Sequence, residues 1–352
     1  MVEKKINNNS TKELEKTNVT KKTTNSKRKI KNKFLKESGK RAKTSIILLL
    51  IIIPSVFFAA LGPVVFYDIT IIGVIFEIYS ILFQIALLLL LIYAIYEAVK
   101  FINPKDRETS KEQLLVLFLP LAIIFGLTFF TFSWSELAPI ISFVPYTPNW
   151  LKFLDSKNVI LIGVLVFLSS LVFTSVSFKD SVVALIMSLL FYWFLESFTK
   201  SIIDGGWQVV FLIILIPVVS DIAAYYGGKK YGENHIFPNI SPNKTLEGFM
   251  IGLISSVTVG FIFFLILFGF TDTGFASSNS NQFVQAWGML FIIPISALAS
   301  PFGDLTFSKI KRAYHKKDFS NLLPGHGGVF DRLDSHIFAF ISFWTLIEIF
   351  II

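Results

Sequence analysis

The chain has 352 residues, of which 53% are hydrophobic and only 16% are charged, whereas a soluble domain carries about 25% charged residues. The apolar residues lie in blocks of roughly 17–30, the length needed to cross a hydrocarbon core of about 30 Å. These features exclude a soluble globular protein and predict an all-α polytopic membrane protein. The absence of cysteine excludes disulfides and thiolate metal sites, and four scattered histidines argue against a zinc site.

The net charge of +8 is concentrated in the N-terminal segment, since residues 1–44 hold 15 of the 32 Lys and Arg. This segment is rich in Lys, Asn, Thr and Ser, a composition typical of disorder. We therefore predict a disordered, basic cytoplasmic tail. A nucleic-acid partner is not expected, because a basic segment beside a membrane helix usually sets topology and contacts anionic lipid.

Hydropathy predicts about nine transmembrane helices, and the short polar stretch 178–180 between the fourth and fifth predicts a tight helical hairpin. We divide the chain into the tail, N-terminal helices in 45–200 and a C-terminal catalytic region in 201–352. The nine predicted segments are 45–66, 70–99, 113–133, 158–177, 181–199, 206–226, 247–270, 286–302 and 335–352.

The distribution of Lys and Arg predicts the orientation of these segments. With a cytoplasmic N-terminus, 29 of the 32 basic residues lie on the inner side, and the outer side keeps only Lys152, Lys157 and Lys200. Without the tail the division is still 14 to 3. We therefore expect a multi-pass protein of the plasma membrane whose polar loops face the cytoplasm.

The first polar run begins with Asp221, inside the end of the sixth segment. An acid after a long apolar run usually faces a polar cavity. Gly227 and Gly228 allow backbone N–H groups to approach a phosphate closely. The alternative is a helix end with a glycine cap and with Lys229 and Lys230 extending to the interface. The residues alone leave both interpretations open.

The second polar run is Ser241-Pro242-Asn243-Lys244-Thr245-Leu246-Glu247-Gly248. It is typical of a helix start with Pro242 at the first helical position. In that case Lys244 is an ordinary flanking charge. In a functional interpretation Lys244 binds phosphate, and Glu247 is its charge partner or a supporting acid.

The third polar run, residues 303–335, is the most densely charged after the tail. Asp304 follows Pro294 and Pro301, which can kink or end a helix. Ser308 lies three and four residues before Lys311 and Arg312, so that the three share a helix face. Acids that bind a hard cation, beside bases that bind phosphate, are what metal-assisted phosphoryl or nucleotidyl transfer requires.

The end of this run combines a turn with two acids. The sequence Pro324-Gly325-His326-Gly327-Gly328 predicts a tight turn, because three glycines and a proline favour little else. Asp331 and Asp334 are three residues apart and project from one helix face, while Arg332 points elsewhere. The alternative is a set of solvated charges at helix ends.

Over the 27 positions from Ser308 to Asp334, the sequence resembles the signature of the CdsA-type phosphatidate cytidylyltransferases without a mismatch. The runs 221–232 and 241–248 resemble that family's preceding motifs in the same order. The resemblance is strong over 205–352 and rests on hydropathy alone before that. Asn243 stands where the family often has a lysine, which leaves one cation fewer near the expected nucleotide site.

The resemblance implies transfer of CMP from CTP to phosphatidate, with Mg²⁺, a second cation such as K⁺, and a homodimer. It implies catalytic roles for Asp304, Lys311, Arg312, Asp331, Arg332 and Asp334, with the metal held by Asp304, Asp331 and Asp334. The expected substrate-binding residues are Asp221, Lys244, Glu247, Ser308, Lys317, Asp318, His326, Gly327 and Gly328.

Two alternatives belong to other classes. A CTP-dependent polyprenol or phytol kinase shares the membrane architecture and the nucleotide, but the complete signature through Asp334 argues against it. A transporter predicts ionisable residues deep in several segments, whereas Glu77, Glu97 and Asp221 are few and lie mostly near segment ends.

Overall fold

The computed structural model describes residues 70–102, 177–203, 205–238, 240–269, 282–320 and 327–350, together with positions 164, 165 and 168. Within these residues the secondary structure consists of α-helices and one isolated antiparallel β-bridge, between His235 and Thr245. The helices are α2 (Thr70–Ile102), α5 (Phe178–Ile203), α6 (Gly206–Tyr231), α7 (Leu246–Gly269), α8 (Gln282–Ala313) and α9 (Phe330–Phe350).

Each of these six helices is long and apolar enough to cross a membrane. The predictions of an all-α fold and a multi-pass membrane protein are therefore confirmed, and α2, α5, α6, α7, α8 and α9 match six of the nine predicted segments. The predicted tail 1–44 and the predicted segments 45–66 and 113–133 lie outside the described residues, as does nearly all of 158–177.

The structure corrects two predicted helix starts. Residues 178–180 do not form a hairpin turn but the first turn of α5, where the Asp180 N–H donates to the Ser177 hydroxyl at 3.2 Å. Pro242 is not the first residue of a helix, because α7 begins at Leu246. Thr245 caps α7 instead, since its hydroxyl accepts a hydrogen bond from the Gly248 N–H at 3.2 Å.

The prolines of α8 do not end that helix. The helix continues through Pro294 and Pro301 to Ala313, about 11 residues beyond the predicted end. Membrane helices tolerate proline because neighbouring helices and local adjustments satisfy the freed carbonyl groups. Asp304 therefore lies within a helix, and Ser308, Lys311 and Arg312 continue the same helix.

Helices α6 and α7 approach each other closely through small residues. A Cβ atom at Gly252 would lie 2.7 Å from the Ser220 carbonyl oxygen, and one at Gly248 would lie 2.8 Å from that of Ala224. Lipid tails are as apolar as leucine, so close van der Waals packing of this kind, rather than burial from water, holds membrane helices together. The α6–α7 pair is consequently a tight antiparallel hairpin.

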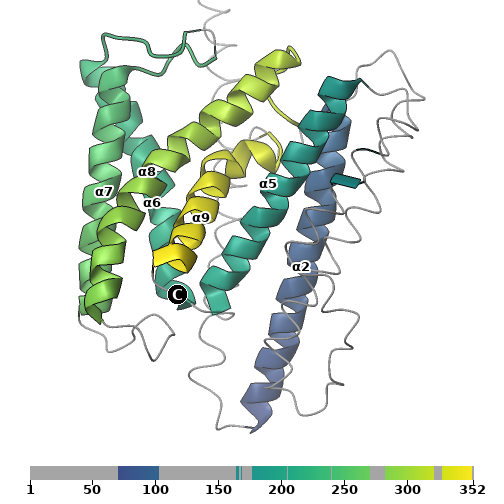
Figure 1. Cartoon of the computed structure of the whole chain (residues 1–352), viewed down its shortest axis with the longest axis vertical. Helices are drawn as coiled ribbons and strands as arrows, with labels where there is room; N and C mark the ends of the chain where they lie inside the picture. The colour runs from purple at the N-terminus through teal and green to yellow at the C-terminus, as the bar shows by residue number, and fades with distance from the viewer. Residues whose placement is uncertain are drawn as a thin grey trace, which may run out of the picture.

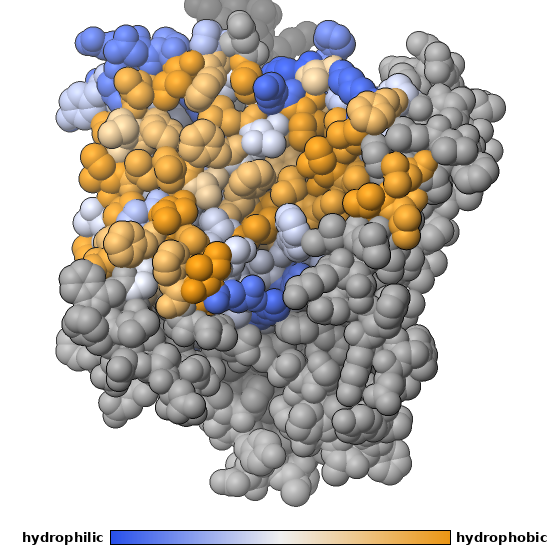
Figure 2. All heavy atoms as spheres, viewed as in Figure 1, coloured by the Kyte–Doolittle hydropathy of each residue, from blue (hydrophilic) through white to orange (hydrophobic). Residues whose placement is uncertain are grey.

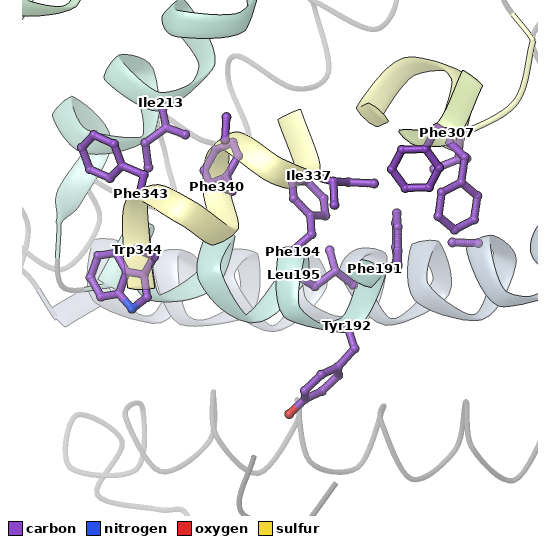
Figure 3. Packing of buried hydrophobic residues seen from close by; sticks show 14 of the residues in the cluster. Phe191, Tyr192, Phe194, Leu195, Ile213, Phe307, Ile337, Phe340, Phe343 and Trp344 are labelled. Carbon is purple, nitrogen blue, oxygen red and sulfur yellow. The ribbon is translucent and has the colours of Figure 1, made fainter. Parts of the chain in front are cut away.

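An aromatic core joins α5, α8 and α9 (Figure 3). The Phe194 and Phe340 rings meet edge to face with centroids 5.5 Å apart, and Phe191 contacts Phe330 at 5.3 Å. Phe330 in turn lies 5.5 Å from Phe307 of α8. Edge-to-face and tilted geometries of this kind are favourable for aromatic pairs, and they fix the first turn of α9 against α5 and α8.

Polar residues gather at one end of this bundle. In Figure 1 the loop between α6 and α7, the C-terminal end of α8 and the N-terminal end of α5 lie at the top, and the C-terminus lies lower, at the opposite end of α9. Figure 2 shows an apolar band over the described helices with hydrophilic residues along its upper edge. The motif-bearing ends of α6, α7, α8 and α9 are thus brought to the same side of the apolar band.

Candidate functional site

The innermost part of the site is an ion pair between the last turn of α8 and the first turn of α9. The Lys311 Nζ atom lies 2.9 Å from Asp331 Oδ1, and the two side chains are only 10% and 5% exposed. The other carboxylate oxygen of Asp331 accepts hydrogen bonds from the Phe319 N–H at 2.7 Å and the Gly328 N–H at 2.9 Å. Asp331 therefore ties together three segments of the predicted signature.

Gly327 is required by the geometry around Asp331. Its φ of +82° lies in the left-handed region that residues with a Cβ rarely adopt. A Cβ atom there would also lie 2.7 Å from Asp331 Oδ2. The predicted turn at 324–328 is described only from Gly327 onward, and its described part has the backbone geometry that glycine favours.

A second ion pair lies nearer the surface, between Lys244 and Asp304. Lys244 precedes α7 and reaches across to α8, where its ammonium group contacts Asp304 Oδ2. The Ser308 hydroxyl donates to Asp304 Oδ1 at 3.2 Å, one helical turn further along α8. The Lys244 and Asp304 side chains are 32% and 24% exposed, so this pair can be reached from outside.

Asp221 and Asp334 complete the charged cluster. Asp221 lies within electrostatic range of Asp304 and Lys244, and Asp334 lies within range of Asp304, Lys311 and Asp221. The Asp334 carboxylate also accepts the N–H of the next residue at 2.8 Å. Three carboxylates and two ammonium groups, from α6, α8, α9 and the segment before α7, therefore share one region.

The three acids of the predicted metal site have separate partners within the described residues. Asp331 is occupied by Lys311 and two backbone N–H groups, while Asp304 faces Lys244 and Ser308. Within the ranges that the structure describes, no three Asp, Glu or His side chains are close enough together to hold a metal ion. The donors Asp304 and Asp334 suit a hard cation chemically, but Asp331 is used to build the turn.

Several predicted residues lie away from this cluster. Glu247 accepts hydrogen bonds from the Asn234 side chain at 2.8 Å and the Glu233 N–H at 3.1 Å, and so braces the α6–α7 hairpin. Arg312 is exposed and donates to the Lys316 carbonyl at 3.0 Å, beyond the end of α8.

The other predicted residues outside the cluster are on the surface or not described. The exposed residues are Lys317, Asp318 and Arg332, and His326 lies outside the described residues. Gly227 of the first polar run lies against α7, since a Cβ at this position would lie 2.8 Å from the Ile251 side chain. A Cβ at Gly228 would lie 2.9 Å from the Thr245 hydroxyl.

Sequence reasoning missed the residues that support the site from the N-terminal helices. The Glu97 carboxylate of α2 accepts a hydrogen bond from the Val329 N–H at 2.8 Å, just before α9. From α5, Asp180 accepts one from the Tyr314 hydroxyl at 2.7 Å. Burial and this bond to Asp180 raise the pKa of Tyr314 above its usual value. The available signal for Glu97 was an acid in an apolar run, which usually has a specific partner.

The sequence of the chain is similar to a protein-family model and to several individual proteins. A family model described as the cytidylyltransferase family matches residues 62–350. The chain is 30% identical over 167 residues to the phosphatidate cytidylyltransferase of Bacillus subtilis (strain 168), which covers 47% of this chain and 56% of that protein. It is 38% identical over 144 residues to the Helicobacter pylori (strain J99) protein of the same name, covering 41% and 48% respectively.

A third relative is covered more fully. The phosphatidate cytidylyltransferase of Staphylococcus haemolyticus (strain JCSC1435) is 29% identical over 262 residues, which are 67% of this chain and 95% of that protein. The chain thus spans about half the length of the first two relatives.

Proposed function

Since this chain belongs to the cytidylyltransferase family, we propose that it transfers CMP from CTP to phosphatidate, giving CDP-diacylglycerol and pyrophosphate. The observation that carries this proposal is the convergence of the three polar runs. Lys244 pairs with Asp304, and Lys311 pairs with Asp331, at the same end of an apolar helix bundle. Such a site offers cations to phosphates beside a surface that suits acyl chains.

The proposed reaction requires little acid–base help from the protein. An oxygen of the phosphatidate phosphate attacks the α-phosphorus of CTP, a new P–O bond forms, and the bond to the β-phosphate bridging oxygen breaks, releasing pyrophosphate. The attacking phosphate already carries negative charge at neutral pH. Positioning of the two substrates and stabilisation of the charge on the leaving pyrophosphate should therefore dominate catalysis.

The two lysines differ in how freely they can serve this reaction. Lys244 belongs to the more exposed ion pair, so its ammonium group can exchange Asp304 for a substrate phosphate. Lys311 is buried against Asp331 and also lies 5.4 Å from the Phe319 ring centroid, so it supplies charge from a fixed position. We assign phosphate binding to Lys244 and a fixed electrostatic contribution to Lys311.

We also propose a requirement for Mg²⁺, which rests on the family resemblance and on the carboxylates near Asp304. Asp304 and Asp334 would hold the ion, and Asp221 lies within electrostatic range of both. A bound Mg²⁺ would neutralise triphosphate charge. A second cation such as K⁺ belongs to the same proposal. Metal titration of the activity, with EDTA as control, tests the requirement.

The membrane environment and the orientation are part of the proposal. Six described helices suit a multi-pass protein, and the relatives are bacterial, which supports a location in the plasma membrane. Lys179 in the first turn of α5 and Lys230 in the last turn of α6 lie at the helix ends that carry the motifs. Lys200 lies in the last turn of α5 and pairs with Glu348 near the end of α9. This asymmetry supports a cytoplasmic site. A homodimer, expected from the resemblance, is tested by the mass of the detergent-solubilised protein.

The test of the proposed function is formation of CDP-diacylglycerol by the purified protein in detergent. The reaction contains phosphatidate, Mg²⁺ and CTP labelled in the α-phosphate, and both the lipid product and pyrophosphate are measured. Asp304→Asn is the test variant, because it is nearly isosteric and removes a charge from the cluster. Glu233→Gln is its matched control, since Glu233 is an exposed acid just beyond α6, at the same end of the molecule.

We expect labelled lipid and an equal amount of pyrophosphate from the wild type and from Glu233→Gln, and little of either from Asp304→Asn. Release of CDP with transfer of the γ-phosphoryl group would instead indicate a lipid kinase. If neither product forms with any phosphatidate or divalent cation, the proposed activity is wrong.

A further inference from the structure

Glu97 is a buried acid in a helix that the sequence motifs do not reach. It lies in α2 (Thr70–Ile102), is 1% exposed, and precedes the strongly resembling region 205–352 by more than a hundred residues. A buried carboxylate is costly unless hydrogen bonds or charges compensate for its lost hydration. Its contacts therefore indicate what the residue is for.

The Glu97 carboxylate holds the start of α9. Its Oε2 atom accepts hydrogen bonds from the Val329 N–H at 2.8 Å and the Phe330 N–H at 3.4 Å. The first N–H groups of a helix have no partner within the helix, and the helix dipole favours an anion at this end. Glu97 thus caps α9 from another helix.

The other carboxylate oxygen lies against the glycine pair. A Cβ atom at Gly328 would collide with Glu97 Oε1, and the Ser320 hydroxyl also lies beside this carboxylate. The N–H of Gly328 meanwhile donates to Asp331 at 2.9 Å. Gly328 is therefore held between two carboxylates, one from α2 and one from α9.

The end of α2 also holds the segment that follows α8. The Lys316 ammonium group donates to the Phe101 carbonyl oxygen, and the rings of Phe101 and Phe319 lie 4.4 Å apart. The Phe319 N–H in turn donates to Asp331 at 2.7 Å. One turn of α2, from Glu97 to Phe101, consequently contacts the chain on both sides of residues 321–326.

From these contacts we propose that Glu97 is a positioning residue of the cytidylyltransferase site. By fixing Gly328, Val329 and Phe330, it sets the first turn of α9, and with it the placement of Asp331 against Lys311. Glu97 touches no reacting atom in this proposal. The kinetic part of the inference rests on the proposed function, whereas the anchoring of α9 does not.

The test compares three variants of the full-length protein in detergent. Glu97→Ala removes the carboxylate, and Glu97→Gln keeps one acceptor oxygen for the Val329 and Phe330 N–H groups. Glu196→Ala is the matched control, since Glu196 is an acid of helix α5 that pairs with Lys200 at 3.2 Å. For each variant, kcat and KM for CTP and phosphatidate are measured, together with hydrogen exchange of the backbone N–H groups in 327–335.

We expect Glu97→Ala to lower kcat by about 100-fold with little change in KM, because a misplacement of about 1 Å in a catalytic group costs this much. The Val329 and Phe330 N–H groups should exchange faster in this variant. Glu97→Gln should recover most of kcat and of the protection from exchange, and Glu196→Ala should match the wild type in both. Should Glu97→Ala not fold, Glu97→Gln still carries the comparison.

Three results would overturn the inference. The first is unchanged exchange at Val329 and Phe330 in Glu97→Ala, and the second is equal kcat in Glu97→Ala and Glu196→Ala. The third is a Glu97→Gln variant as impaired in kcat as Glu97→Ala, since an acceptor oxygen alone should restore the position of α9. If the wild type forms no CDP-diacylglycerol, the proposed function fails, but the exchange measurement still decides whether Glu97 anchors α9.

Discussion

The two lysine–aspartate pairs of the site are built for different purposes. Lys311 and Asp331 are 10% and 5% exposed, and both oxygens of Asp331 have partners within the protein. Lys244 and Asp304 are 32% and 24% exposed, and the Ser308 hydroxyl also donates to Asp304. The inner pair closes a turn, whereas the outer pair joins the segment before α7 to α8 at a surface that ligands can reach.

This difference shows that one charged motif can contain both residues that stabilise the fold and residues that are free to bind a ligand. A buried pair loses much of its attraction to the cost of dehydration, but removing one partner leaves an uncompensated charge inside the protein. An exposed pair contributes little to stability and can be exchanged for a ligand. Substitutions at the inner pair should therefore reduce folding and activity together, and those at the outer pair should reduce activity alone.

The largest expected effect is that of Asp331→Ala. Loss of the carboxylate leaves Lys311 buried and removes the acceptor of two backbone N–H groups, so we expect a loss of about 3–5 kcal/mol in the free energy of unfolding. Titration with SDS, followed by circular dichroism, measures this loss. Asp331→Asn, which keeps one acceptor oxygen, should lose less. If the Asp331→Ala protein is as stable as the wild type, the inner pair does not stabilise the fold.

The second prediction concerns the outer pair. Lys244→Met should lower kcat/KM for CTP by about 100-fold, the typical cost of losing one group that stabilises transition-state charge. Its free energy of unfolding should fall by at most about 1 kcal/mol, because the pair is partly exposed. Steady-state kinetics and SDS titration give the two values. Lys230→Met is the control, since Lys230 at the same end lies over the Tyr231 ring at 4.9 Å.

If Lys244→Met were to unfold as readily as Asp331→Ala, the distinction between the two pairs would be lost. The same conclusion would follow if Lys230→Met reduced kcat/KM as strongly as Lys244→Met, because the effect would then be one of general surface charge.

The helices could be anticipated from the sequence more fully than the ion pairs of the site. The expected charge partner of Lys244 was Glu247, but Lys244 pairs with Asp304. Apolar runs of membrane-spanning length located six described helices, because length and composition alone decide whether a helix can span. Helix ends were harder to predict. The end of α8 was placed near residue 302, but the helix continues to Ala313 because polar residues remain helical beyond the apolar core.

The part of the site that could not be predicted depends on contacts between distant segments. Spacing placed Asp331 and Asp334 on one face, but it could not show that Lys311 and two backbone N–H groups occupy Asp331. The partner of Glu97 is even further away, since 232 positions separate it from Val329. Hydropathy shows that burying such an acid costs hydration free energy, but it does not show which groups form the compensating hydrogen bonds.

A third prediction tests the turn that closes around the inner pair. Gly327→Ala places a Cβ at a φ of +82° and near Asp331 Oδ2, so we expect a loss of about 1–2 kcal/mol or more in the free energy of unfolding. The converse change is His315→Gly, because His315 has a φ of +54° after the end of α8. It should gain about 1 kcal/mol. Equal effects of the two variants in SDS titration would contradict this account.

The smallest expected effect comes from the contact of α5 with the segment after α8. Burial and the hydrogen bond to Asp180 raise the pKa of Tyr314, so the folded protein retains this proton more firmly than the unfolded chain. The contribution of the neutral Tyr314 phenol to the free energy of unfolding is therefore fully present below pH about 10, and it decreases as the pH rises further. Tyr314→Phe should lose about 1 kcal/mol at neutral pH.

The pH dependence separates this contact from general alkaline unfolding. The wild type should lose more stability than Tyr314→Phe between neutral pH and pH about 11, when both are measured by SDS titration. Parallel curves for the two proteins would show that Tyr314 does not contribute to the loss.

The long separation between Glu97 and its partners also has a consequence for biosynthesis. When Glu97 is added to the growing chain, the ribosome has yet to add the 232 residues that lead to Val329. At roughly 5–20 residues per second, that interval lasts about 12–46 seconds. Throughout it, the N–H groups that hold the Glu97 carboxylate in the finished protein do not exist. Assembly of this bundle is therefore complete only after the last helix has been made.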